Sequence, residues 1–494
     1  VTFRADGSSK FAPSNRWGYF PAAALGWRMS EEAFLNDVDW LDNLKLRVSY
    51  GEVGNDGINS SLWSQNWEAT SDKRYQGAVN GAFLPSYSLG ADMANKDLKW
   101  ETTITRNIGV DFGFFNSRLT GTIDAYWNTT KDLLMKTAIP GITGFTSTYA
   151  NVGQTSNKGI EIALQGVLVK TRDWNVTAGF NINFNRGKVD KLADNVTGLY
   201  GTEWATSSTF PKSDYVLKEG RPVGLVRGLT ADGFYTTDDF TYENGVYTLK
   251  EGVADVSSAV FPNYHLHNGM NERPAGQLAY PGMAKFKDLN DDGIINDDDV
   301  DVIGDMTPVH TGGFNINATY KNFDLGLYFN WSYGNEIYNV NKLAALYGYK
   351  EGAVYENKLS IVKDCYKIYD VVNGELVALT TPEQLNAANA NAKLPLAYSE
   401  NGYVSTLGIE DGSYLRLNTL TLGYTLPKSM LQKAGISNLR VYGSIYNVFT
   451  ITGYSGIDAE VSTSTSTKTY PQLGMDWGTY PRARSFVLGV NLSF

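Results

Sequence analysis

Acidic and amide side chains at 288–299 have the spacing of a calcium-binding loop. Oxygen-bearing side chains occupy positions 1, 3, 5, 9 and 12 of this segment, Gly293 occupies the turning position 6, and a backbone carbonyl follows at position 7. The ligands would be Asp288, Asn290, Asp292, the carbonyl of Ile294, Asn296 and Asp299. We expect Ca²⁺ here, because calcium takes six to eight hard oxygens, although the last position is Asp instead of the usual Glu. The alternative is an acidic surface corner that holds no metal.

The three histidines of the chain, His265, His267 and His310, lie in one long connection. A His-x-His pair can contribute to a zinc site, but a complete site needs further ligands, so we expect loop histidines without a metal. The sequence has no G-x-S-x-G nucleophile motif, and its single cysteine, Cys365, excludes an intrachain disulfide and Cys-based metal sites. These residue types argue against an enzyme.

Aromatic rings gather in the long segments between the expected strands. Such rings can stack on sugar faces while neighbouring Asp and Asn side chains bind hydroxyl groups. The candidates for ligand binding are Trp63, Trp67, Trp204, Tyr454 and Trp477. The alternative is that most of these rings pack the loops against one another and against a partner protein.

Alternation of apolar and polar residues is the strongest pattern in the chain. It is cleanest at 174–185 and recurs at 108–114, 119–127, 323–333 and 486–494, the last of which ends on the carboxy-terminal Phe. A period of two predicts β-strands, and a face that stays apolar over about ten residues matches the lipid side of an outer-membrane barrel strand. We therefore expect an all-β chain that forms part of a transmembrane antiparallel β-barrel.

The segments between the expected strands alternate between short and long, as in barrels with short periplasmic turns and long outer loops. The short turns are expected at about 30–41, 115–118, 170–173, 321–322 and 427–437. The long segments, expected on the extracellular side, are 53–102, 129–156, 187–311, 335–412 and 450–483. This spacing predicts about twelve strands. The pattern is weakest at 413–425, where the two faces separate poorly, and at 187–311, which has room for another hairpin.

The composition narrows the class of protein. The 494 residues include 42 Lys+Arg and 52 Asp+Glu, which gives a net charge of −10 and argues against nucleic-acid binding. No run reaches the roughly 18 apolar residues of a transmembrane helix, so a chain that spans a membrane does so with strands. Because the chain opens at Val1 in a strand-like pattern, without an initiator Met or a signal peptide, we expect a fragment or a processed piece.

Short motifs spread over nearly the whole of 1–494 carry a family resemblance. They lie at 4–11, 16–21, 26–28, 44–51, 98–101, 157–161, 288–299, 414–417 and 447–450. In sequence and in order they resemble motifs in the carboxy-terminal part of the barrel of the SusC/RagA family. The members of this family are TonB-dependent transporters in the outer membrane of Bacteroidetes.

The resemblance implies the second half of a 22-stranded barrel whose amino-terminal plug is absent from these residues. It also implies coupling to TonB, a SusD-like surface lipoprotein that covers the long loops as a lid, and dimers of such transporter–lid pairs. On this basis we expect an active importer of oligomeric nutrients, most directly oligosaccharides. An oligopeptide importer of the same family and a passive porin or adhesin barrel are alternatives. A secreted calcium-dependent binding or hydrolytic protein is another, although the regular loop alternation speaks against it.

Overall fold

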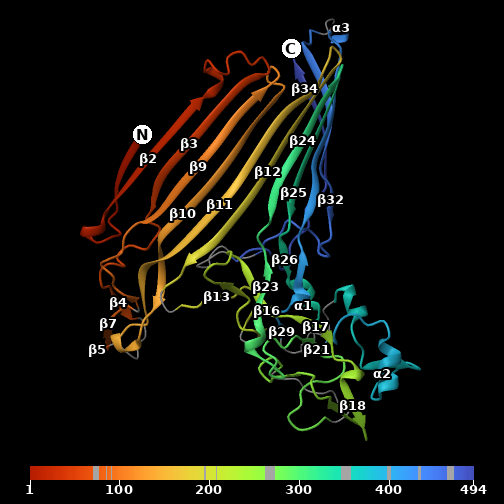
Figure 1. The fold of residues 1–494 in the computed structure, drawn as a ribbon. Coiled ribbons are helices and arrows are strands. Elements are labelled where there is room, and N and C mark those ends of the chain that lie inside the picture. The colour runs from red at the N-terminus through yellow and green to blue at the C-terminus, as the bar shows by residue number, and fades with distance from the viewer. Residues whose placement is uncertain are drawn as a thin grey trace.

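The computed structural model describes residues 1–70, 77–84, 86–90, 92–193, 196–206, 209–261, 273–346, 358–397, 402–431, 435–463 and 472–494. Long strands form one curved wall, and a mass of loop segments extends from one end of it (Figure 1).

Twelve strands follow one another across the wall, and each is hydrogen-bonded to the next. They are β1 (Thr2–Gly7), β2 (Trp17–Arg28), β3 (Leu41–Asn55), β9 (Glu101–Phe114), β10 (Leu119–Ala138), β11 (Ser147–Lys170), β12 (Trp174–Lys191), β24 (His310–Tyr320), β25 (Phe323–Tyr333), β31 (Tyr414–Thr425), β32 (Asn438–Thr452) and β34 (Ser485–Ser493). The short strand β8 (Asp92–Met93) adds a parallel pairing to β11. The twelve are antiparallel and keep their sequence order, so the prediction of about twelve antiparallel strands is confirmed.

The alternation of residues gives the wall one apolar face and one polar face. Where β24 meets β25, Phe314 lies opposite Phe329 and their rings stack with centroids 4.3 Å apart. The next pair, Asn315 and Tyr328, points to the other side because successive side chains of a strand alternate. Large apolar side chains remain exposed on the first face, as at Leu488, which is 89% exposed. We call the apolar face the outer face and the polar face the inner face.

The poor alternation at 413–425 has a local cause in β31. The ladder between β25 and β31 contains a β-bulge at Asn418. Leu417 lies opposite Phe329 on one side of the bulge, and Leu420 lies opposite Leu327 on the other. The extra residue thus moves the apolar positions from odd to even numbers while the outer face stays apolar.

Short turns join the strands at one end of the wall and long connections leave the other end (Figure 1). Lys321, in the two-residue turn between β24 and β25, has a φ of 53°, and Asn116, between β9 and β10, has a φ of 56°. The segment 129–156 differs from the loop expected there, because β10 and β11 continue to pair up to Ala138 and Ser147. Only 139–146 connects these two strands, so they form a long projecting hairpin.

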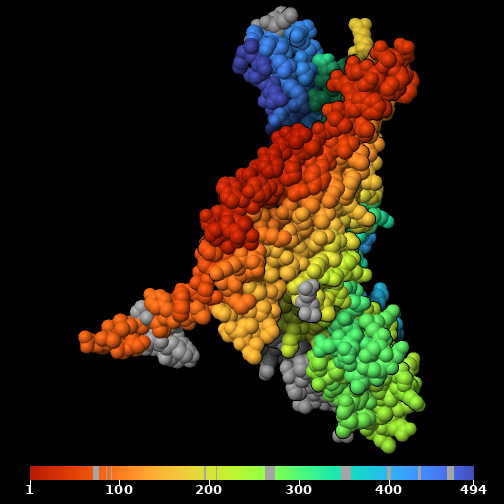
Figure 2. Space-filling model, turned by 60° about the vertical axis from the view of Figure 1, so that its left-hand side comes forward, coloured from red at the N-terminus to blue at the C-terminus, as the bar shows by residue number. Residues whose placement is uncertain are grey.

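The long connections contain many short elements of their own. Four strands form an arm that projects from the wall (Figures 1 and 2): β4 (Trp67–Thr70), β5 (Gly77–Val79), β6 (Ala82–Leu84) and β7 (Ser86–Leu89). The connection between β12 and β24 contains β13 (Leu199–Gly201), β14 (Thr209–Phe210), β15 (Tyr215–Leu217), β16 (Leu225–Leu229), β17 (Ala231–Phe234), β18 (Phe240–Glu243), β19 (Val246–Leu249), β20 (Asp255–Val256), β21 (Ala284–Phe286), β22 (Ile294–Ile295) and β23 (Val300–Asp305). The later connections contain β26 (Glu336–Asn339), α1 (Val340–Leu346), β27 (Tyr369–Val372), β28 (Glu375–Ala378), α2 (Pro382–Asn389), β29 (Gly402–Tyr403), β30 (Ile409–Asp411), α3 (Lys428–Leu431) and β33 (Met475–Asp476).

The connections between β12 and β24, between β25 and β31 and between β32 and β34 together form what we call the loop mass. The loop mass has its own hydrophobic core, to which all three connections contribute. Tyr215, Tyr235 and Tyr247 come from the connection between β12 and β24, and Leu343 and Leu385 come from the next one. Each of these five side chains is at most 1% exposed. The long connections therefore pack into one body, which Figure 2 shows mainly in green below the wall.

The two outermost strands of the wall have open edges. In the part of the chain that the structure describes, β1 pairs only with β2 and β34 pairs only with β32. An open strand edge leaves backbone N–H and C=O groups without partners. Among the helices of the described residues, none is long and apolar enough to cross a membrane.

Candidate functional site

The inner face of the wall carries charges that are paired across neighbouring strands. Arg47 on β3 donates from Nη2 to Asp111 on β9 at 2.8 Å and to Asp124 on β10 at 3.0 Å. Further along the strand order, on the same inner face, Nε of Arg440 on β32 donates to Asp324 on β25 at 2.8 Å. These pairs let a polar face carry ionic groups while each charge keeps a partner.

Two hollows on the inner face lie toward the end with the short turns. One has a volume of about 510 Å³, and its lining includes the amide and hydroxyl side chains of Thr120, Gln165 and Asn181. The other has a volume of about 350 Å³ and includes Asn317 and Thr421 in its lining. Amide and hydroxyl groups bind water or hydroxylated ligands by hydrogen bonds, so this face suits a hydrated passage.

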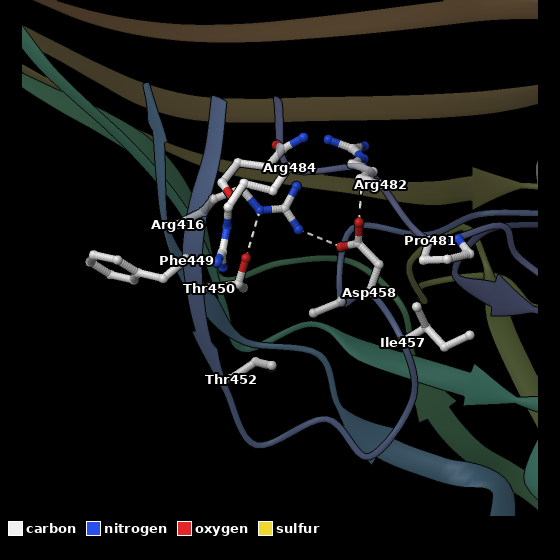
Figure 3. Close-up of a pocket in the computed structure, with 11 residues that line it drawn as sticks. Arg416, Phe449, Thr450, Thr452, Ile457, Asp458, Pro481, Arg482 and Arg484 are labelled. Carbon is white, nitrogen blue, oxygen red and sulfur yellow. Dashed lines mark hydrogen bonds and ion pairs between the residues drawn. The ribbon is translucent and has the colours of Figure 1, made fainter. Parts of the chain in front are cut away.

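A buried ionic cluster joins the wall to the connection between β32 and β34 (Figure 3). Arg416 of β31 is 3% exposed, and it donates to Asp458, to Glu460 at 2.8 Å and to the hydroxyl of Thr450 at 2.9 Å. Arg482 approaches Asp458 at 3.3 Å from the strand-side end of the same connection. A cavity of about 270 Å³ lies beside this cluster. The bonds from Arg416 hold the loop against the inner face of the wall.

A second polar cluster links β30, α1 and the same connection. The carboxylate of Glu410 accepts from the backbone N–H of Ser455 at 2.9 Å and from Nζ of Lys342 at 3.1 Å. Burial raises the pKa of Glu410, but the hydrogen bonds from Ser455 and the charge of Lys342 outweigh burial and hold the pKa below its ordinary value. Nearby, burial and the carboxylate of Asp476 raise the pKa of the Tyr454 hydroxyl, which donates to that carboxylate at 2.7 Å. These bonds fasten β30, α1 and the connection between β32 and β34 to one another.

A cavity at the mouth of the wall has several aliphatic side chains in its lining, together with charged and polar ones such as Lys136 and Asn157. It has a volume of about 800 Å³ and lies between the projecting hairpin, β12 and the loop mass. Leu133 and Met135 line it from the hairpin, and Leu199 and Leu217 line it from the loop mass. The aliphatic part of this lining can accept an apolar group.

The five aromatic residues predicted to bind ligand lie in different surroundings. Trp67 on the arm is 66% exposed and Trp477 is 49% exposed, so both present open ring surface. Trp63 is half-buried, and Trp204 packs against the core of the loop mass. Tyr454 is 6% exposed and its hydroxyl bonds to Asp476, so this ring packs the loops instead of facing a ligand. The five rings thus differ in exposure, and their role in binding stays a prediction.

The predicted calcium loop forms a tight corner in which oxygens bond to backbone amides. Asp288 accepts from the N–H of Gly293 at 2.7 Å, and Asp292 accepts from the N–H of Ile294 at 2.9 Å. Asn290 and Asn296 bond within the loop in the same way. Asp299 is fully buried, and its two oxygens accept from the N–H groups of Leu289 and Asn296. Among the described residues no group of His, Cys, Asp and Glu has the geometry to hold a metal, and calcium binding stays a prediction.

His265 and His267 lie outside the described residues, whereas His310 belongs to the outer face. The Nδ1 of His310 accepts from the indole N–H of Trp331 at 3.0 Å, and its ring stacks on Tyr333. Sequence reasoning missed the clusters around Arg47, Arg416 and Glu410. A carboxylate on the polar side of a strand, such as Asp111, was the available signal, because a wall of this kind places a cation opposite it.

Comparisons with known proteins identify the architecture. Residues 1–339 match the family described as TonB dependent receptor-like, beta-barrel. TonB-dependent receptor P3 of Formosa agariphila is 31% identical over 502 residues, which cover 100% of this chain and 43% of that protein. TonB-dependent receptor SusC of Bacteroides thetaiotaomicron is 30% identical over 502 residues, which cover 100% of this chain and 42% of that protein. The chain thus spans less than half of the length of these curated relatives.

A solved structure shares the fold over the full chain. The RagAB peptide importer in its closed-closed state superposes with a TM-score of 0.71 at 24% sequence identity, covering 100% of this chain and 45% of that chain. In its open-open state the TM-score is also 0.71 at 24% identity, with coverage of 100% and 44%.

Proposed function

Because this chain belongs to the family of TonB-dependent receptor-like β-barrels, we propose that it forms part of the wall and the outer loops of an active outer-membrane importer. Members of this family are outer-membrane receptors and transporters, not enzymes. The observation that carries the proposal is the division of the wall into an apolar outer face and an inner face with paired charges. Such a wall suits lipid on one side and a hydrated passage on the other.

Closure of the barrel requires strands beyond the twelve of this wall. An unpaired strand edge is unstable in hydrocarbon because its backbone polar groups find no partners there. The open edges of β1 and β34 are such edges. We therefore place this wall in a closed barrel of about 22 strands whose other strands and plug come from the rest of the protein, with import driven through TonB.

The loop mass supports a surface partner. Its elements pack into one body around a shared core, and the arm beside it exposes apolar side chains such as Phe83 and Tyr87. We assign to this side a SusD-like lipoprotein that covers the mouth as a lid, and we expect the transporter–lid pairs to dimerise. Affinity purification of the full-length protein from native outer membranes, followed by mass spectrometry, tests this assignment. Recovery of the barrel without a lipoprotein would contradict it.

Oligosaccharides are the substrate class that we propose. The amide and hydroxyl lining of the inner face can bind sugar hydroxyls, and the exposed rings of Trp67 and Trp477 can stack on sugar faces. The variants Trp67→Ala and Trp477→Ala should lower uptake of a labelled oligosaccharide by the full-length protein. Trp40→Ala is the matched control, because Trp40 is 53% exposed but lies at the end with the short turns. Equal uptake by all three variants and the wild type would contradict a role of these rings.

Oligopeptides are the second candidate, and the cavity of about 800 Å³ at the mouth favours them. The aliphatic part of its lining fits a branched apolar side chain, which peptides have and sugars lack. Growth of a deletion strain on separate oligosaccharide and oligopeptide panels distinguishes the two candidates. A growth defect confined to peptides would overturn the assignment to oligosaccharides and leave the importer in place.

A further inference from the structure

Three cations lie in one row on the outer face of the wall, close to the end with the long loops. Arg106 on β9 lies opposite Trp127 on β10, Trp127 lies opposite Lys158 on β11, and Lys158 lies opposite Arg186 on β12. We call Arg106, Lys158 and Arg186 the cationic row. The strands β9 to β12 are neighbours, so the row spans three strand spacings, or about 14 Å.

The row borders an apolar band on the same face. The next position on each strand of that face, toward the short turns, is Ile108, Ala125, Ile160 or Phe184. On β12 the band runs from Trp174, whose ring packs on Tyr320, to Arg186. The twelve steps between these two residues, at about 3.3 Å each and a tilt of about 45°, span about 28 Å, which is close to the apolar band of a membrane barrel. The cationic row therefore lies where hydrocarbon gives way to lipid headgroups.

The cationic row differs from the arginines of the inner face in its partners. Arg47, Arg416 and Arg440 each contact a carboxylate. In the part of the chain that the structure describes, none of the three cations of the row forms an ion pair. Arg106 donates only to the hydroxyl of Thr129 at 3.4 Å, and Arg186 donates to backbone carbonyls, among them that of Pro308 at 2.7 Å. Glu52, one position further toward the loops on this face, instead accepts from the hydroxyl of Tyr50.

The placement of Lys158 opposite Arg186 favours the binding of an anion between them. Like charges directly opposite each other on adjacent strands destabilise the pairing. Both side chains are exposed, so an anion can approach them from outside the wall. A second copy of this chain is a poor occupant, because a two-fold contact would bring the row against itself and face cations with cations.

We infer that the cationic row binds the phosphate-bearing headgroup of a glycolipid, of the lipid A class, in the leaflet on the long-loop side. Arginine and lysine are the usual ligands of phosphate oxygens. Trp127 lies in the row between Arg106 and Lys158, where its ring can contact a sugar of the headgroup. A disaccharide with phosphate at its ends matches a row about 14 Å wide better than a phospholipid with a single phosphodiester. The inference rests on the proposed function to the extent that the long loops face the outer leaflet.

The test compares two triple variants of the full-length protein with the wild type. One is Arg106→Gln, Lys158→Gln and Arg186→Gln, which removes the cationic row. The matched control is Arg118→Gln, Lys170→Gln and Lys321→Gln, which removes three exposed cations at the end with the short turns. Each purified protein is delipidated and placed in nanodiscs that contain lipid A, dephosphorylated lipid A or phosphatidylglycerol. Lipid retained after washing is counted by mass spectrometry, and heat-modifiable gel migration shows that the barrel is folded.

Retention of lipid A should fall by about tenfold or more in the first variant and stay at the wild-type level in the control, since charge-assisted hydrogen bonds to phosphate are lost. Dephosphorylated lipid A should be retained weakly by all three proteins. Wild-type retention of lipid A by a folded first variant would overturn the inference, and so would equal retention of phosphatidylglycerol and lipid A by the wild type. Substrate uptake is measured separately, so a protein that binds lipid A without transporting a nutrient would contradict the proposed function alone.

Discussion

Loss of the Arg416 guanidinium should release the connection between β32 and β34 from the wall. The variant Arg416→Met leaves Asp458 buried without its main partner, since the side chain of Asp458 is 6% exposed. Breaking a buried pair costs about 3–5 kcal/mol, and we take about 3 kcal/mol because Arg482 still contacts Asp458. This value corresponds to an increase of about 100-fold in the opening equilibrium of the loop.

Hydrogen exchange measures this opening at defined amides. The N–H of Glu460 bonds to Asp458 at 2.9 Å, and the N–H of Thr463 bonds to the carbonyl of Met475 at 2.8 Å. Both amides should exchange about 100-fold faster in Arg416→Met, because the free energy of the local opening that exposes them falls. The double variant Arg416→Met with Asp458→Asn should recover most of the protection, because it leaves no buried charge unpaired.

The control is Arg440→Met, which breaks a different Arg–Asp pair of the inner face and should leave both amides unchanged. Wild-type exchange in Arg416→Met would refute the reasoning. An equal loss of protection in the single and double variants would also refute it, because the effect would then not come from an uncompensated carboxylate.

Four further results are expected of the full-length protein. Leu327→Arg should lower the free energy of unfolding in vesicles by about 2–4 kcal/mol, whereas Asn315→Arg on the inner face should change it little, and equal effects in urea titrations would contradict the assignment of the faces. Addition of Ca²⁺ after chelation should slow hydrogen exchange at 288–299, and Asp292→Asn should weaken this response. Exchange rates that do not change when Ca²⁺ is added would contradict a calcium site in this loop. The pKa of Glu410 is lower in the folded protein than its ordinary value of 4.5, so its carboxylate stabilises the loop above pH 4.5, and this stability is lost as the pH falls through the folded pKa. Proteolysis of the loop should therefore become faster at low pH in the wild type, and Glu410→Gln should remove this dependence on pH. Burial raises the pKa of the Cys365 thiol to about 11, so maleimide at pH 8 should label it only after unfolding, and rapid labelling of the folded protein would contradict its burial.

The strands of the wall were predictable from the sequence because their side chains face lipid and water in turn, which makes the sequence periodic. A strand with lipid on one side and water on the other must alternate, and β25 and residues 174–185 of β12 do so. The prediction was less clear at 413–425, where one extra residue, Asn418, shifts the period while the contacts stay regular. It was wrong at 129–156, since nothing in the alternation shows that two strands continue to pair beyond the membrane band.

The candidate site was predictable only in part, because it depends on register and on contacts between distant segments. Asp111 and Asp324 were visible as polar positions, but their partners Arg47 and Arg440 follow from strand order. The sequence of the loop mass shows no alternation of apolar and polar residues. Tyr454 was therefore predicted as a ligand-binding ring, although the fold buries it.

Energised uptake by whole cells tests the central claim most directly. A deletion strain is complemented with the full-length gene and supplied with a labelled oligosaccharide on which the wild type grows. The account predicts accumulation against a gradient that stops when a protonophore collapses the inner-membrane proton gradient or when TonB is removed. Uptake that continues under both conditions, driven only by the concentration of the sugar outside, would contradict an active importer and indicate a passive porin.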